Sequence, residues 1–157
     1  MSDVGRVVEA TALRPRDEAF RCLADLVVAR FGRCTVTVNR TLLATEEVER
    51  VFSDDPGHYP VGGRKQKRGT DWAGIVLHRG ELFVASGPAT IARHFDDHAL
   101  IASLGITEIV NVPVLRAGRS VATLNLSRFA PRFTEAERQD LLLVAGLVLP
   151  LVQDPAP

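Results

Sequence analysis

The side chains best suited to bind a ligand form a basic run in the middle of the chain. It holds four cations within five residues: Arg64, Lys65, Lys67 and Arg68. Two glycines precede the run and a predicted helix follows it, so free backbone N–H groups and the positive end of a helix lie nearby. Together these features favour an anion. The run predicts a loop that binds a small anionic ligand, and a solvated turn is the alternative. It is too short and isolated to indicate nucleic-acid binding.

Two aromatic residues flank the basic run. Tyr59 and Trp72 are the only tyrosine and tryptophan of the chain. Rings in these positions either wall a pocket or pack the loop onto the rest of the fold. We expect both to contact the ligand, because ligand sites are lined largely by apolar and aromatic side chains.

An acidic residue and a histidine stand together at Asp97 and His98. No second histidine follows at helical spacing, so we expect no metal. Asp97 is suited to cap the helix that begins there, and ligand contact is the other interpretation for both residues. An acid–base pair in a divergent redox or hydrolytic enzyme is the alternative function. No pattern identifies a catalytic residue or a cofactor.

The chain has two cysteines, Cys22 and Cys34. Cys22 falls in a predicted helix, and Cys34 falls on the strand face that this helix should cover. We expect two buried, inert thiols. Redox sensing is the alternative, since a reactive thiol needs exposure and a cationic neighbour.

Three predicted strands each have one apolar face and one face with small polar groups. They span residues 33–39, 108–115 and 119–127. Successive side chains point to opposite faces of a sheet, and the terminal helices should cover the apolar face. The other face carries Asn111, Thr123 and Asn125, whose burial is costly without hydrogen bonds. We expect these three to line a ligand pocket, and an exposed antiparallel face is the alternative.

The remaining pattern supplies the elements that position these groups. Residues 1–14 have no clear period and are expected to form a flexible arm before a domain over 15–153. The expected order is a helix from Pro15 to Gly32, strands at 33–39 and 47–53, a loop at 54–70, a helix at 71–78, a strand at 82–85, helical turns at 88–95 and 97–104, and a hairpin at 108–127. Thr134 and Glu137 form a capping box that opens the last helix.

Composition narrows the class of protein. The formal net charge of the 157 residues is zero, so no overall field favours nucleic acid or a membrane. The N-terminus has no apolar core of a secretory signal, and the longest apolar run, 141–152, is too short to cross a bilayer. We therefore expect a cytoplasmic protein.

The last predicted helix is apolar on every side over residues 141–152, whereas covering one sheet face needs only a stripe. The first predicted helix adds Leu26 and Val28 outside its main stripe. A second partner is implied, and the simplest is the same helix pair of another copy. We expect a homodimer through the terminal helices.

At this point the sequence resembles the GAF family. The resemblance covers residues 15–153 and is closest in EIVNVPVLRAGRSVATLNLSRFAPRFTEAERQDLLLVAGLVLPLV; HYPVGGRK, FDDHALIASLG and NVPV resemble stand-alone bacterial members. It implies an α+β fold with a central antiparallel sheet of five to six strands. The terminal helices would lie on one face, and a pocket under loops on the other. GAF domains commonly pair through terminal helices, which agrees with the expected dimer.

Motifs of some family members are missing from this sequence, which excludes several ligand classes and one type of chemistry. The N-K…F…D-E signature of cyclic-nucleotide members cannot be placed, and no cysteine lies where bilin-binding members need one. The chain has no cysteine after Cys34, so the thiol chemistry of free methionine sulfoxide reductases is not expected. The sequence therefore predicts a small-molecule-binding sensory domain without enzymatic activity, and a ligand-free interaction module is a further alternative.

Overall fold

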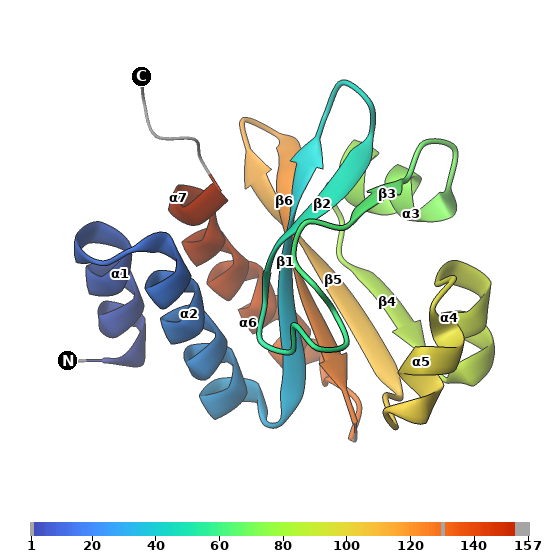
Figure 1. Ribbon diagram of the computed structural model, residues 1–157, viewed down its shortest axis with the longest axis horizontal. Coiled ribbons are helices and arrows are strands. Elements are labelled where there is room, and N and C mark those ends of the chain that lie inside the picture. The colour runs from blue at the N-terminus through green and yellow to red at the C-terminus, as the bar shows by residue number, and fades with distance from the viewer. Residues whose placement is uncertain (1, 130, 153–157) are drawn as a thin grey trace.

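The computed structural model describes residues 2–129 and 131–152, which form a six-stranded antiparallel sheet between two groups of helices (Figure 1). The strand order is β3-β2-β1-β6-β5-β4. The strands are β1 (Cys34–Leu42), β2 (Glu47–Ser53), β3 (Arg64–Gln66), β4 (Phe83–Ser86), β5 (Glu108–Arg116) and β6 (Arg119–Arg128). The predicted α+β fold and strand number are confirmed.

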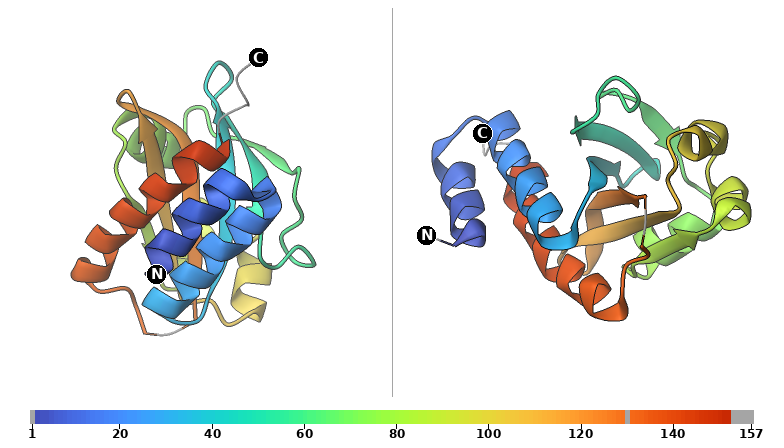
Figure 2. Two further views of the ribbon diagram at one scale, coloured as in Figure 1. Left: turned by 90° about the vertical axis from the view of Figure 1, so that its left-hand side faces the viewer. Right: turned by 90° about the horizontal axis from the view of Figure 1, so that it is seen from below.

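The two ends of the chain form a helical layer on one side of the sheet, and the middle of the chain covers the other (Figure 2). The first group comprises α1 (Asp3–Leu13), α2 (Arg16–Phe31), α6 (Glu135–Ala145), η2 (Gly146–Val148) and α7 (Leu149–Val152). The second comprises α3 (Asp71–Ala73), η1 (Gly74–His78), α4 (Pro88–His94) and α5 (His98–Ser103). No helix among the described residues is both long and apolar enough for a bilayer crossing.

The predicted asymmetry of the strands is confirmed, because each sheet face contributes to a different core. Val36, Val112 and Leu124 belong to the core shared with the terminal helices, and all three are fully buried. Trp72 and Ile109 belong to a second core on the opposite face. The sheet is therefore a partition with an apolar core on one side and a mixed polar and apolar environment on the other.

The predicted helix ends are confirmed by local geometry. Pro15 is the N-cap of α2, and Gly32 ends this helix with a φ of 85°, which a glycine adopts without strain. Thr134 and Glu137 form the expected capping box at the start of α6. These boundaries fix where β1 and α6 begin.

Two segments differ from expectation. Instead of a flexible arm, Asp3–Leu13 forms α1, because Ser2 caps it and Val7 and Ala10 are buried against the helical layer. The expected loop at 54–70 contains β3, which pairs with Glu47–Glu49 of β2. A three-residue pairing between distant segments leaves no periodic signal in the sequence. The predicted domain end at 153 lies outside the described residues.

Part of the apolar surface assigned to a partner copy is covered within the chain. Leu26 is 5% exposed and shares the core cluster of Val7 and Ala10 in α1. In the last helical segment, Leu141 and Val148 are fully buried. The inference of a second copy therefore depends on the apolar side chains that stay exposed on this layer.

Candidate functional site

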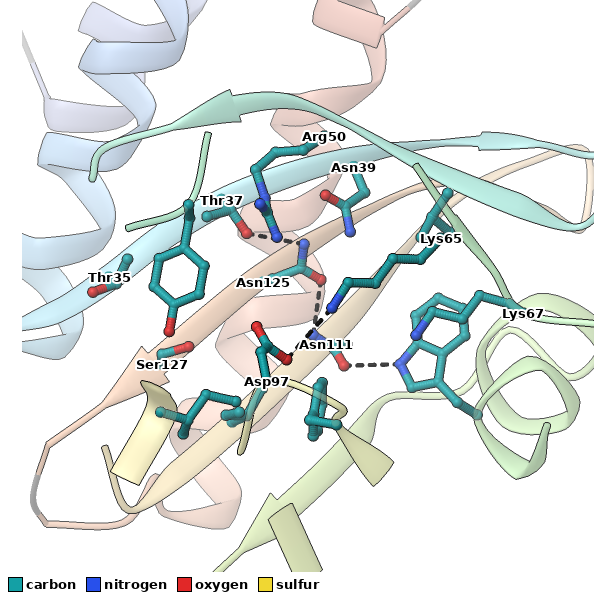
Figure 3. Close-up of a pocket in the computed structure, with 16 residues that line it drawn as sticks. Thr35, Thr37, Asn39, Arg50, Lys65, Lys67, Asp97, Asn111, Asn125 and Ser127 are labelled. Carbon is teal, nitrogen blue, oxygen red and sulfur yellow. Dashed lines mark hydrogen bonds and ion pairs between the residues drawn. The ribbon is translucent and has the colours of Figure 1, made fainter. Parts of the chain in front are cut away.

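A pocket lies on the polar face of the sheet, beneath the 54–70 segment and the α4–α5 connection (Figure 3). It encloses about 80 Å³ of space open to water. By this measure a cavity of about 10–15 Å³ holds one water molecule. The pocket therefore has room for several waters or for a small organic molecule.

A row of hydrogen bonds crosses the floor of the pocket. The Trp72 indole Nε1 donates to Asn111 Oδ1 at 2.8 Å. Asn111 Nδ2 donates to Asn125 Oδ1 at 2.8 Å, and Asn125 Nδ2 donates to Thr37 Oγ1 at 3.2 Å. Figure 3 shows the row running across β5, β6 and β1. The sheet positions these side chains because Asn111 stands opposite Asn125, and Thr37 opposite Asn125, in the strand register.

Cations contribute to the lining of the pocket. Lys65 Nζ pairs with Asp97 Oδ1 at 3.4 Å (Figure 3). Lys67 Nζ lies 4.8 Å from the centre of the Trp72 ring. Burial lowers the pKa of Lys67, and the neighbouring Lys65 lowers it further. Desolvation of Lys67 and its repulsion by Lys65 both cost free energy, and a negatively charged ligand would offset this cost.

Three polar atoms of the lining are buried without a hydrogen-bond partner among the described residues. They are Asn39 Oδ1, Arg50 Nε and Tyr59 Oη. Burial raises the pKa of Tyr59 to about 12, with Asp97 adding to the shift, so its phenol keeps its proton. The Arg50 guanidinium lies 5.4 Å from the Tyr59 ring centre and donates to Pro60 O at 3.2 Å. Buried polar atoms are nearly always paired, so these three indicate a ligand or ordered water.

The pocket lining contains most of the residues that the sequence predicted for a ligand site. Those that line it are Tyr59, Lys65, Lys67, Trp72, Asp97, Asn111 and Asn125. Asp97 is the N-cap residue of α5 but makes no side-chain capping bond, because its carboxylate faces Lys65. Whether these residues bind a ligand stays a prediction.

Four predicted residues do not line this pocket: Arg64, Arg68, His98 and Thr123. Alternation along β3 sends Lys65 inward, whereas Arg64 pairs with Glu49 at 3.7 Å. Arg68 pairs with Glu46 at 3.5 Å. His98 is exposed, and Thr123 is completely buried with Oγ1 unpartnered among the described residues.

Several lining residues were not predicted. The polar ones are Thr35, Thr37, Asn39, Arg50 and Ser127, and the apolar ones are Val48, Phe95, Ile101 and Ile109. Strand alternation already placed the three β1 residues on the polar face. Arg50 follows Val48 by two positions in β2, so the same rule would have found it.

The two thiols lie apart from the pocket. Cys34 belongs to the helix-side core, and burial, helped by Asp54, raises its pKa to about 12. Cys22, in α2, is half-buried. The part of the chain that the structure describes contains no group of three or more His, Cys, Asp or Glu residues suited to hold a metal ion. The pocket offers hydrogen bonding and charge, and no cysteine or metal cluster.

Solved structures with a similar arrangement include GAF domains and a reductase. The GAF domain of a phosphoenolpyruvate-protein phosphotransferase from Coxiella burnetii superposes with a TM-score of 0.75 at 14% identity, covering 95% of this chain and 90% of that one. The corresponding domain from Acinetobacter gives 0.72 at 13%, covering 97% and 94%. A type II free methionine-R-sulfoxide reductase from Thermoplasma acidophilum gives 0.64 at 10%, covering 87% and 91%.

At these identities the solved structures show the fold alone. The sequence has no significant match among curated proteins. The family model of the GAF domain matches residues 15–148, which is most of the chain and includes every residue of the pocket lining. The chain therefore belongs to the GAF domain family.

Proposed function

We propose that this GAF domain is a sensory module that binds a small anionic molecule in the pocket above its sheet. The observation that carries the proposal is the set of buried, unpartnered polar atoms at Asn39, Arg50 and Tyr59 inside a cavity. A folded chain that leaves such atoms unpaired loses about 1–3 kcal/mol for each. A bound molecule that pairs with them would recover part of this cost.

The charges of the lining support an anion. Arg50, Lys65 and Lys67 are cationic, and Asp97 is the only acidic residue among the pocket's lining residues. Lys67 is partly desolvated, which makes an opposite charge beside it more favourable than in water. A neutral or cationic ligand would leave this excess of positive charge without a partner.

The groups that would serve an enzyme are not assembled in the pocket. Asp97 is engaged by Lys65, and His98 is exposed and outside the lining. Cys34 is on the other side of the sheet. These placements favour binding over catalysis, and the cytoplasmic location expected from the sequence stays a prediction.

Binding is tested with Trp72, the only tryptophan, because its indole forms part of the pocket. A ligand at about 100 times its dissociation constant adds about 2.7 kcal/mol of stability. For a domain of this size that raises Tm by about 5–10 °C. A panel of anionic, neutral and cationic metabolites is screened by thermal shift, and each hit is titrated by tryptophan fluorescence. If no compound changes either signal, the domain is a ligand-free interaction module and the proposal fails.

We also propose that the domain works as a homodimer through its helical layer. Val8 and Leu13 of α1 are 54% and 75% exposed, and Leu142 and Leu143 of α6 are 40% and 76% exposed. Apolar side chains gathered on one layer favour association.

Leu143→Glu is expected to convert the dimer to a 17.1 kDa monomer, because it places a charge on this surface. Light scattering across a concentration series measures the mass. Val61→Glu is the matched control, since Val61 is 56% exposed but lies in the 54–70 segment. A wild-type chain that stays monomeric, or a Leu143→Glu chain that stays dimeric, would contradict this interface.

A further inference from the structure

The hydrogen bonds of the pocket floor have a fixed direction. An indole N–H donates and never accepts, so Trp72 requires the oxygen of the Asn111 amide to face it. The nitrogen of Asn111 must then face Asn125, which turns the Asn125 oxygen toward it. The Asn125 nitrogen in turn meets Thr37 Oγ1. Trp72 thus sets the orientation of both amides, which electron density alone rarely distinguishes.

This direction leaves donors for a ligand. Each amide oxygen of the row already accepts one hydrogen bond within the row, and each amide nitrogen carries a second N–H. The hydroxyl of Thr37 accepts from Asn125, so its own hydrogen is free to donate. Among the hydrogen bonds of the described residues, none uses the second N–H of Asn111 or Asn125, or the Thr37 hydrogen. A row of three available donors beside Lys65 matches the oxygens of an oxyanion.

Four lining residues form an apolar wall beside the polar ones. Val48, Ile101 and Ile109 are at most 4% exposed, and Phe95 completes this wall. Inorganic phosphate or another small fully hydrated anion would gain nothing from such a surface. A ligand that contacts both the donor row and this apolar wall combines an oxyanion head with a short apolar body.

Resting on the proposed binding function, we propose that the ligand is a small carboxylic acid with an apolar body. Its carboxylate accepts hydrogen bonds from the Thr37–Asn125–Asn111 row and replaces Asp97 as the ion-pair partner of Lys65. The apolar body lies against Ile101 and Ile109. Lys65 and Asp97 both line the pocket, so the carboxylate of Asp97 competes with the ligand for the same cation.

If the ligand carboxylate binds this row and competes with Asp97 for Lys65, two substitutions should change the affinity in opposite directions. Asn125→Asp keeps the shape and the acceptor for Asn111 but removes a donor and adds negative charge to the floor. We expect it to weaken binding of pentanoate by about tenfold or more. Asp97→Asn removes the competing charge and is expected to strengthen binding about three- to tenfold. The side chains of the pair that it breaks are 46% and 30% exposed, so folding should be little affected.

The probe is pentanoate, titrated into the full chain at constant ionic strength and followed by Trp72 fluorescence and by thermal shift. Pentanamide, pentylammonium and inorganic phosphate are the comparison compounds. Gln66→Glu is the charge control, because Gln66 is exposed and lies outside the lining. Wild type should bind pentanoate at least about tenfold more tightly than the three comparison compounds, and Gln66→Glu should change its affinity less than about twofold.

Each outcome decides between the two proposals. Equal binding of pentanamide or phosphate, or weaker binding by Asp97→Asn, would overturn the carboxylic acid assignment. Tighter binding of pentylammonium would overturn it too, while leaving a small-molecule sensor in place. If pentanoate and the metabolite panel all leave fluorescence and Tm unchanged, the binding function itself fails.

Discussion

Glu108→Ala is expected to lower the free energy of unfolding by about 3–5 kcal/mol, the largest loss that we predict for one side chain. Glu108 is completely buried in β5. Its Oε1 accepts from the backbone N–H of Phe133 at 2.7 Å, and its Oε2 accepts from Ser86 and pairs with Arg138 at 3.4 Å. This carboxylate therefore holds β4, β5 and the start of α6 together, and its loss removes a partner from the buried Phe133 N–H and from the partly buried Ser86 and Arg138.

Equilibrium urea unfolding, followed by tryptophan fluorescence and circular dichroism, measures this loss. Glu135→Ala is the matched control, because Glu135 pairs with the same Arg138 at 3.9 Å but its side chain is 75% exposed. An exposed pair of this kind contributes about 0–1 kcal/mol. Equal losses in the two variants would show that the buried carboxylate has no special structural role.

Leu124→Ala is expected to cost about 3 kcal/mol, because it leaves a cavity in a core that cannot close around it. Leu124 is completely buried on the helix side of β6. Its cross-strand neighbours Val38 and Val112 are also completely buried. These three side chains are central to the layer that the terminal helices cover.

The adjacent residue provides the control. Thr123 is equally buried, points to the opposite face, and leaves Oγ1 without a partner among the described residues. Thr123→Val keeps the shape and removes this hydroxyl, so unfolding free energy should stay the same or rise by up to about 1 kcal/mol. Both variants are compared by urea unfolding. A comparable loss in Thr123→Val would contradict the separation of the two faces.

Local rules were sufficient for most of the fold and for the floor of the site. Strand alternation assigned Asn111 and Asn125 to the face away from the helices, where both lie. Capping chemistry located the ends of α2 and α6. These features depend on residues a few positions apart, which a single sequence displays directly.

Features that depend on distant contacts were not predictable in this way. The basic run contributes Lys65 and Lys67 to the pocket but turns Arg64 and Arg68 away, because β3 pairs with a strand some 17 residues earlier. Nothing local marks that register.

Helix α1 lies before the matched family region but packs on the domain, so the folded unit begins earlier than the family match. The matched family region starts at residue 15, after α1 has ended at Leu13. Yet α1 contributes Val7 and Ala10 to the core cluster that includes Leu26. A chain trimmed to the family boundary would keep every pocket residue and lose the outer cover of α2. Its new apolar surface would promote aggregation or artificial self-association in any assay of the trimmed domain.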